Sequence, residues 1–338
     1  MSSTLYSRPQ FEKFCAAMAR TYNVKTVAEM FSIDIPKALK LINAIQESAE
    51  FLNLVNMVGT TDKAGRVVEL SANTPIASTT DTSGAGERSP KRVTSKEERN
   101  YLCQQVNFDW GIGYEELDQW RRFSDYNARV QSMILTRIAL DLLLIGFYGT
   151  SHAATSDPVA NPLLQDVHPG WLFDLKTNKP ANYIGPVGEA TQILIGGDGA
   201  AYANIDQAAY DMLTLIPKAK RNGREMVIIG QNLLSHEAEV LYELYGRKPT
   251  EKQAMQALSK GFGGMKAVVP AGFPDNGLMV CDPSQLLIYV QDSSIRKMIV
   301  DNPKKDQIEH YQSQNLDYKI ADLDCVVALD YTKVALGD

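Results

Sequence analysis

The sequence has few cysteines, and they lack the spacing of a zinc site. Its 338 residues contain four, none of them in a CxxC pair. They are Cys15, Cys103, Cys281 and Cys325. Such wide spacing argues against structural zinc and against a dense disulfide framework. We therefore expect four reduced thiols, no metal and no cofactor, in a protein that is made in a cytoplasm.

An excess of positive charge and a long hydrophobic run are also missing. The chain has 34 basic and 40 acidic residues, for a net charge of −6. A protein that reads a DNA sequence usually has a basic excess, whereas one that merely encloses DNA needs none. The longest apolar stretch lies within Ile134–Phe147 and contains Arg137 and Asp141, so we predict no membrane span. No secretory signal precedes the first helix pattern.

The motifs of common catalytic sites are absent. There is no GxxxxGK[ST] loop and no GxGxxG after a strand, and the glycine-rich Gly196–Gly199 lacks a following lysine and predicts a turn. His236-Glu237 begins like a zinc-protease helix, but position 240, where the second histidine ligand would stand, is Val240. The single copy of Asp81–Gly84 lacks the second carboxylate of an aspartic protease. None of the four histidines has a nucleophile context, so we predict no catalytic residue.

The first half of the chain contains clear helix and strand patterns. Phe11–Tyr22 has helical apolar spacing, and Pro36 is placed to open a second helix with Leu39, Ile42 and Ile45 on one face. Ser32–Pro36 is then a junction between these helices, and 51–58 a short strand. Apolar residues alternate from Leu102 to Tyr114, which predicts one long half-buried strand, with Cys103 on its polar side. A helix over 124–148 follows, with Gly149 after its end.

The second half mixes helices and strands without regular alternation, which predicts the α+β class. Expected helices lie at 205–219, 235–245 and 250–260. Expected strands lie at 226–229, 267–269, 279–280, 286–290, 297–300, 317–320 and 325–329.

A long polar stretch separates the first helices from the long strand. From Ser71 to Pro90, fifteen of twenty residues are Ser, Thr, Gly, Ala or Pro. Such a segment cannot bury a core of its own. Two interpretations remain open: a floppy loop, or an extended arm that becomes ordered only on a neighbouring subunit.

Several stretches with uncommon residue spacing are spread along the whole chain. They are Ile76–Thr82, Glu87-Arg88 with Pro90-Lys91, Asn107–Asp109, Asn161-Pro162 with Leu164–Val167, Gly170-Trp171 and Asn302–Lys304. In these the chain resembles the major capsid proteins of P-two-like tailed bacteriophages (Peduovirus type). That family has the Hong-Kong-97-type phage capsid fold. The resemblance implies a shell subunit of the virion and not an enzyme.

The resemblance also implies an architecture. Residues 1–31 would be an N-terminal segment removed on maturation, 32–58 an N-arm and 59–100 an extended β-hairpin, the extension loop. Residues 101–204 and 292–322 would form a peripheral domain with the spine helix 124–148. Residues 205–291 and 323–338 would form an axial domain.

Processing and assembly are further implications of the resemblance. A prohead protease would cut at the junction of Phe31 and Ser32, although an ordinary helical N-terminus that stays in place is the alternative. Glu87, Arg88, Lys91 and Arg92 are candidates for intersubunit ion pairs in the loop. Nothing marks Lys63, Lys91 or Lys96 as a buried cross-linking lysine, so we predict a shell held by non-covalent contacts.

The implied partners are other copies of the chain in hexamers and pentamers, the scaffold and prohead protease, the portal, and packaged DNA bound without sequence specificity. Assembly would take place in the host cytoplasm, without a membrane. Two other functions remain open. One is an encapsulin-like compartment shell, which a native cargo enzyme would favour. The other is an unrecognised hydrolase, which turnover of a substrate would favour.

Overall fold

The computed structural model describes residues 7–67, 77–83, 87–89, 99–116, 126–188, 190–245 and 261–337. The chain divides into two compact units, each made of three stretches of sequence. Unit 1 is Met1–Ala64, Leu102–Phe173 and Leu287–Tyr318; unit 2 is Gly65–Tyr101, Asp174–Leu286 and Lys319–Asp338. Helices and strands are mixed without regular alternation in both units, which confirms the α+β class.

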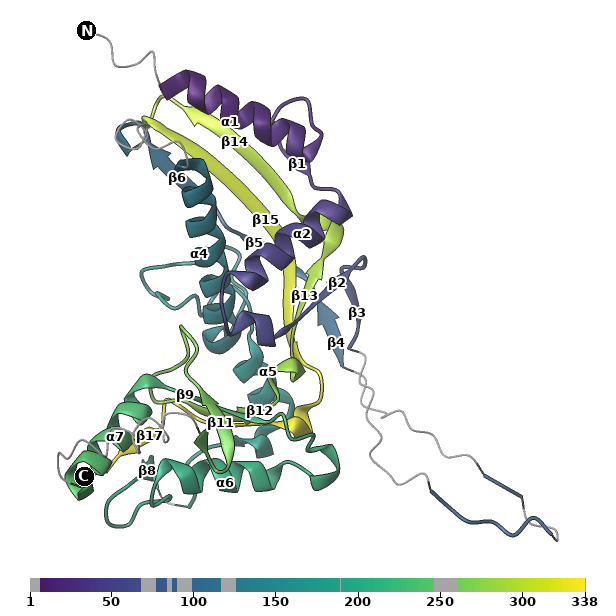
Figure 1. Cartoon of the computed structure of the whole chain (residues 1–338), viewed down its shortest axis with the longest axis vertical. Coiled ribbons are helices and arrows are strands. Elements are labelled where there is room, and N and C mark those ends of the chain that lie inside the picture. The colour runs from purple at the N-terminus through teal and green to yellow at the C-terminus, as the bar shows by residue number, and fades with distance from the viewer. Residues whose placement is uncertain are drawn as a thin grey trace. The chain divides into compact units, whose positions relative to one another are not determined.

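A mixed sheet with the long strand β15 (Gln307–Ile320) at its centre is the framework of unit 1 (Figure 1). The strand order is β1-β14-β15-β13-β2, and β5 and β6 also pair with β15. These strands are β1 (Phe31–Ser32), β2 (Asn56–Thr60), β5 (Gln104–Asn107), β6 (Trp110–Gly113), β13 (Leu286–Gln291) and β14 (Arg296–Asn302). Because β14 is antiparallel to β15 over its whole length, the two form one long ribbon.

The long α-helices in the described part of unit 1 are α1 (Ser7–Tyr22), α2 (Ile35–Glu47) and α4 (Tyr126–Tyr148). By length and composition alone, 128–148 of α4 is apolar enough to cross a membrane. Its second half is nevertheless the core helix of unit 1, because six of its side chains are buried there. They are Ile138, Ala139, Leu142, Leu143, Ile145 and Phe147. The Tyr318 hydroxyl of β15 donates to the Leu142 carbonyl at 2.9 Å, which joins this helix to the sheet.

Trp171 fills the space between α4 and the sheet. It is fully buried, and its indole N–H donates to the carbonyl oxygen of Leu287 in β13 at 2.9 Å. Its ring lies against Gly146 of α4 so closely that a Cβ there would stand 2.3 Å from the ring. The absence of a side chain at Gly146 therefore lets the helix and the indole approach each other.

Unit 2 is built on a six-stranded sheet of order β10-β11-β9-β12-β16-β7. Its strands are β7 (Tyr183–Ile184), β9 (Met226–Ile229), β10 (Gly261–Phe262), β11 (Met265–Val268), β12 (Leu278–Cys281) and β16 (Val326–Leu329). A second ladder joins β8 (Ile193–Ile195) to β17 (Val334–Leu336). The helices are α5 (Trp171–Asn178, whose last residues lie in this unit), α6 (Ile205–Leu215) and α7 (Gln231–Tyr245).

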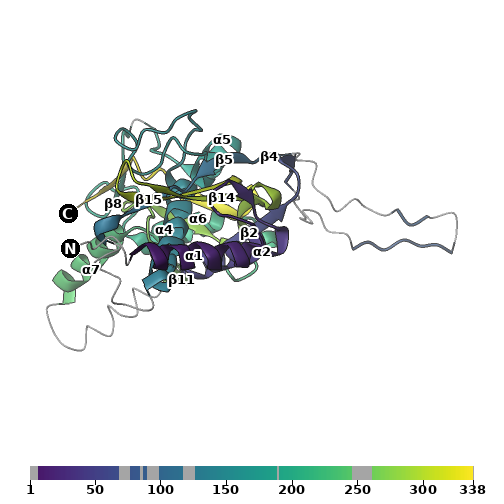
Figure 2. The same cartoon turned by 90° about the horizontal axis from the view of Figure 1, so that it is seen from above.

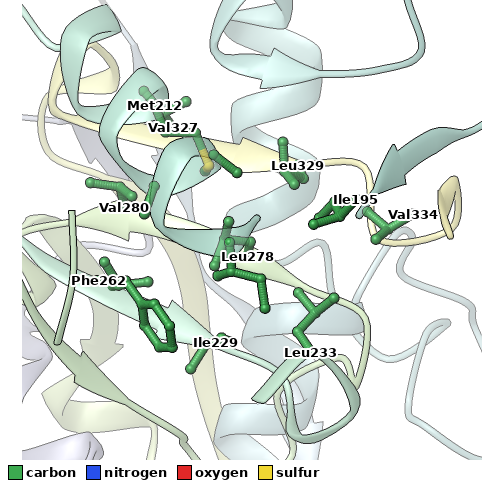
Figure 3. Close-up of a cluster of buried hydrophobic side chains, with 14 of the residues drawn as sticks. Ile195, Met212, Ile229, Leu233, Phe262, Leu278, Val280, Val327, Leu329 and Val334 are labelled. Atoms are coloured by element: carbon green, nitrogen blue, oxygen red, sulfur yellow. The ribbon is translucent and has the colours of Figure 1, made fainter. Parts of the chain in front are cut away.

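The core of unit 2 lies between its sheet and the helices α6 and α7. Met212 of α6 and Leu233 of α7 point at the strand residues Ile229, Leu278 and Val280 (Figure 3). All five side chains are buried. Asn204 caps α6 by accepting a hydrogen bond from the Gln207 backbone N–H at 2.8 Å. This apolar layer covers alternate residues of β9 and β12, and the residues between them, Ile228, Met279 and Cys281, are buried on the other face of the sheet.

The long strand predicted between Leu102 and Tyr114 is interrupted in the structure. β4 (Asn100–Leu102), β5 and β6 are separate strands, and β5 and β6 lie on β15 in one continuous register. Cys103 is buried and Leu102 is half exposed, so the predicted faces are wrong at this end. The buried and exposed faces of the chain change places there, because β4 ends its pairing with β3 at Leu102 and β5 begins to pair with β15 at Gln104.

Other expectations were wrong in part. The strand expected at 51–58 is a 3₁₀ turn, Leu52–Leu54, followed by β2. The strand expected at 317–320 is only the end of the much longer β15. Ser32–Pro36 is not a plain junction, because it begins with part of β1. Leu39 of α2 is 41% exposed instead of lying on the buried face.

The remaining helices and strands agree with the sequence patterns within a few residues, and β9 agrees at both ends. Gly196, Gly197 and Gly199 have positive φ angles, which confirms the predicted turn. The helix expected at 250–260 and the first two residues of the spine helix, 124–125, lie outside the described residues. The two units divide at Phe173 and Asp174, earlier in the chain than the domain boundary expected at 204.

We predict that Gly146→Ala destabilises unit 1. Glycine to alanine inside a helix normally stabilises by about 0.5–1 kcal/mol. Here the new methyl group meets the Trp171 ring, and overpacking should cost about 1–3 kcal/mol instead. The urea midpoint, followed by tryptophan fluorescence, measures the change.

Gly113→Ala is the matched control, because a Cβ at Gly113 meets no heavy atom within 4 Å. This variant should leave the midpoint unchanged or raise it. A Gly146→Ala protein at least as stable as Gly113→Ala would contradict the packing described for Trp171.

Candidate assembly surfaces

The two ends of the extension loop meet in a short ladder of β3 (Ala64–Arg66) with β4 (Figure 1). The Val67 backbone N–H donates to the Arg99 carbonyl at 2.8 Å next to this ladder. The buried Tyr101 ring covers Gly65, where a Cβ would stand 2.6 Å from the tyrosine oxygen. The structure therefore closes the loop at its base.

Arg99 fixes this base to the body of unit 2. Its guanidinium donates to the carbonyl oxygens of Ile320 and Ala321 at 2.6 and 2.8 Å, and forms an ion pair with Asp174 at 3.3 Å. Asp174 is 4% exposed and also accepts from the Ile320 backbone N–H and the Asn178 side chain. A planar guanidinium can serve all these acceptors at once. Sequence reasoning missed Arg99, because its partners lie 75 and more residues away.

The described part of the loop beyond its base is fully open to solvent. All ten residues of 77–83 and 87–89 are exposed. The hydrogen bonds found among them are local: Ser83 donates to the Asp81 carboxylate from its backbone N–H at 2.8 Å and from its hydroxyl at 2.5 Å. These bonds hold the pKa of Asp81 below its usual value. Glu87 and Arg88 are among the exposed residues, whereas Lys91 and Arg92 lie outside the described residues.

The second surface is the N-terminal segment, in which α1 packs against β14 and β15 of the unit 1 sheet (Figures 1 and 2). Phe11, Phe14 and Met18 of α1 lie on a small cluster whose buried members are Val27, Ile299 and Ile308. Most of the other side chains in this cluster are only partly buried. The apolar contact of this helix with the sheet is thus shallow.

The predicted processing junction lies within this segment. Phe31 and Ser32 form β1, which pairs with Lys297 and Arg296 of β14 in antiparallel register. The Phe31 ring is partly buried, 5.5 Å from that of Tyr22. The residues do connect α1 to α2, as the sequence indicated, but their backbone is part of the sheet. Cleavage at this bond stays a prediction.

A half-buried lysine lies next to Tyr22 of α1. The Lys297 ammonium is 3.4 Å from the Tyr22 hydroxyl and 5.5 Å from the centre of that ring. Burial lowers the pKa of Lys297 to about 8. His310 stacks on Trp110 with ring centres 3.7 Å apart, and burial, followed by the Lys297 charge, lowers its pKa to about 4. The alternation that placed Lys297 on a strand did not indicate which element would cover it.

The four histidines lie against carbonyl oxygens, aromatic rings and, for His168, a carboxylate. His236 lies 3.0 Å from the Gly337 carbonyl oxygen, and His152 lies 2.7 Å from that of Val167. The ring of His168 lies near that of His152, and its Nε2 atom is 3.8 Å from a carboxylate oxygen of Asp317. Within the described stretches of the chain, no group of three or more His, Cys, Asp or Glu side chains could hold a metal ion.

Together, the sheet with its long helix in unit 1, the second mixed unit and a loop that closes on the β3–β4 ladder define a phage-type capsid subunit of the Hong-Kong-97 fold. A chain of the satellite phage P4 procapsid that includes the size determination (Sid) protein superposes with a TM-score of 0.73 and 32% identity, covering 88% of this chain and 99% of that one. The capsid of an empty GTA particle shares the fold at a TM-score of 0.53 and 12% identity, covering 83% and 89%.

The family of phage major capsid proteins described as the P2 family matches residues 10–332, and the chain belongs to it. The capsid protein of Escherichia phage P2 is 31% identical over 347 residues, covering 98% of this chain and 95% of that protein. The major capsid protein of Serratia phage KSP20 is 30% identical over 337 residues, covering 96% of each. The chain is therefore a major capsid protein, which assembles into multimeric shells and forms the capsid of the virion.

We predict that Lys297→Met strengthens the docking of α1. The native lysine has a folded-state pKa of about 8 against an ordinary 10.5, so the folded protein binds fewer protons than the unfolded chain between these values. The free energy of unfolding of the wild type should therefore rise with pH between about 8 and 10.5. Below pH 8 the folded protein bears the full cost of burying the charged ammonium. At pH 7 the substitution should stabilise by about 1–3 kcal/mol.

Hydrogen exchange of the α1 amides at pH 7, with urea midpoints at pH 7 and 10, measures both effects. His310, whose pKa of about 4 the Lys297 charge helps to lower, stays neutral between pH 7 and pH 10, so the difference between wild type and Lys297→Met in this range isolates the lysine. Equal pH slopes in the two proteins would show that the ammonium is not desolvated.

Proposed function

We propose that copies of this chain close as hexamers and pentamers into an icosahedral head around double-stranded DNA, and that each extension loop lies across a neighbouring subunit. The observation that carries the proposal is that the base of the loop is fixed to the body of the subunit while the described residues beyond it are exposed. Arg99 holds the base through Asp174 and two carbonyl oxygens. The described residues 77–83 and 87–89, in contrast, are all exposed.

Main-chain pairing supplies the physical reason for such a contact. An extended segment that adds to a neighbour's sheet or surface satisfies its own backbone groups, and threonines such as Thr79, Thr80 and Thr82 suit an extended conformation. Since the loop base is already fixed, less freedom is lost when the loop binds. Weak contacts repeated around a closed symmetric shell then add up to a stable particle.

The charged residues of the loop contribute specificity more than energy in this proposal. Glu87 and Arg88 are exposed, and an exposed ion pair contributes only about 0–1 kcal/mol. Complementary charges at many equivalent contacts nevertheless disfavour a wrong register, because like charges would then face each other. We extend the same role to Lys91 and Arg92, and we propose a shell held without covalent cross-links.

We further propose that unit 1 is the peripheral domain and unit 2 the axial domain of the capsid fold. α4, the expected spine helix, lies in unit 1, and the α/β region from Ile205 to Cys281 lies in unit 2. The structure supports a larger axial domain than the sequence indicated, because 174–204 belongs to unit 2.

The remaining partners follow from the same proposal: a scaffold and prohead protease, a portal, and DNA bound without sequence specificity. The net charge of −6 fits enclosure without tight binding to phosphates. Residues 1–31 hold four basic and two acidic residues, so their removal would change the net charge to −8. We propose no catalytic role for the subunit.

The loop contact can be tested by replacing 77–89 with a Gly/Ser segment of equal length, which keeps β3, β4 and Arg99. Expressed with the phage scaffold and protease, this variant should give at least tenfold fewer closed shells, because each subunit loses the same contact. Negative-stain microscopy counts the shells. The melting temperature of the unassembled subunit is the control and should not change. Normal shells from the variant would refute the role given to the loop.

Processing can be tested on infectious particles. Intact-mass spectrometry of the capsid chain should show a polypeptide that begins at Ser32, because the bond after Phe31 is the proposed site of the prohead protease. Chains from particles assembled with an inactive protease should begin at the original N-terminus. Mature particles whose chains keep residues 1–31 would contradict the processing step.

A further inference from the structure

The bond between Phe31 and Ser32 is not presented to solvent as a flexible linker. Both residues are paired with β14, Phe31 opposite Lys297 and Ser32 opposite Arg296. The hydrogen bonds continue on both sides: the Ile33 backbone N–H donates to the Ile295 carbonyl at 3.0 Å, and the Ile299 backbone N–H donates to the Val27 carbonyl at 2.8 Å. The bond proposed for cleavage therefore lies between residues whose backbones are hydrogen-bonded to the sheet on both sides of it.

A protease must take the backbone of its substrate into a cleft in an extended conformation. β1 is the edge strand of the sheet, and its pairing with β14 occupies one backbone edge and keeps the segment against the sheet, outside such a cleft. Cleavage of folded proteins accordingly occurs at exposed loop tips or after local opening. β1 is neither exposed as a tip nor free of its sheet, so it must first leave β14.

The segment is built so that it can leave without unfolding the rest of unit 1. Its apolar contact has three buried side chains, and two open cavities adjoin it. One, of about 230 Å³, lies between Phe14, Tyr22 and Lys297. The other, of about 290 Å³, lies between Cys15, Val27 and Ile299. Side chains around such cavities lack packing partners, which weakens the contact.

Two further features favour release. α1 has 16 residues, close to the length at which an isolated helix is marginal in water, so it depends on its contact with the sheet. The ammonium of Lys297 also regains water when Tyr22 moves away. Besides Lys297, the ionisable side chains that line the cavity of about 230 Å³ are Tyr22, His310 and Tyr311. None of them is a carboxylate that could pair with the ammonium.

We propose that the pairing of β1 with β14 gates the processing step, so that the bond after Phe31 is cut only after 7–32 has lifted from the sheet. The inference rests on the proposed cleavage between Phe31 and Ser32. It adds that the release of this segment, and not recognition of its sequence, sets the rate of the cut. Any contact made during assembly that lifts α1 would then start maturation.

Limited digestion of the full-length subunit with chymotrypsin tests the gate, because this protease cuts after aromatic residues whether or not the phage protease uses the same bond. Mass spectrometry follows the product that begins at Ser32. Phe14→Ala should loosen α1 and accelerate this cut about tenfold, since cleavage follows the open population when opening is fast. Lys297→Met, which tightens docking, should slow the cut by a similar factor.

Gly146→Ala is the matched control, because it weakens the core of unit 1 away from α1. It should leave the rate after Phe31 unchanged while accelerating cuts at the buried Phe51 and Phe147. Equal rates after Phe31 in wild type, Phe14→Ala and Lys297→Met would overturn the gate. So would acceleration by Gly146→Ala as large as that by Phe14→Ala, since the cut would then follow global unfolding.

The outcomes separate the gate from the processing proposal. Particles whose chains begin elsewhere than Ser32 would refute the processing site, whatever chymotrypsin does. If chymotrypsin cuts after Phe31 faster in Phe14→Ala and more slowly in Lys297→Met than in the wild type, the gate is supported independently of the phage enzyme. Because Lys297→Met acts in the opposite direction to Phe14→Ala, loss of folding cannot produce both results.

Discussion

Backbone pairing along β15 is the constraint on which unit 1 depends. Gln307–Ser313 of this strand pair with β14, and β5 and β6 pair with it as well. The N-terminal segment is attached at β14, and the strand that returns from the extension loop continues into β5 and β6. Within unit 1, one central strand thus holds both the N-terminal segment, through β14, and the strands β5 and β6 that follow the loop in sequence.

The described residues of the two segments follow the same physical rule, since they depend on contacts outside the segment. Loop residues 77–83 and 87–89 are exposed, and α1 rests on a cluster with three buried side chains. Their order depends on hydrogen bonds and contacts made outside the segment. Such segments can exchange partners at small free-energy cost, because little apolar surface is lost in the exchange. A shell subunit needs this property, since it must join neighbours after it has folded.

Local patterns predicted much of the fold. β9 and β12 are continuous apolar runs because both faces of their sheet are covered, and a run of this kind is visible in sequence. β15 was seen only at its end. Its first part contains Glu309, Gln312 and Gln314, which are buried in the structure, so their polarity concealed the strand. The face exchange between Leu102 and Cys103 was equally hidden, because it depends on which ladder each residue joins.

The sequence by itself determined the α+β class, the spine helix, the coreless loop and the resemblance to P2-like capsid proteins, because these depend on composition, on spacing and on residues close together in the chain. Only the tertiary structure decided that Arg99 grips Asp174, that Lys297 lies under Tyr22 and that Phe31 and Ser32 belong to a sheet. Each of these contacts joins residues 75 or more positions apart. Their pairing is set by the path of the whole chain, and no local pattern records it.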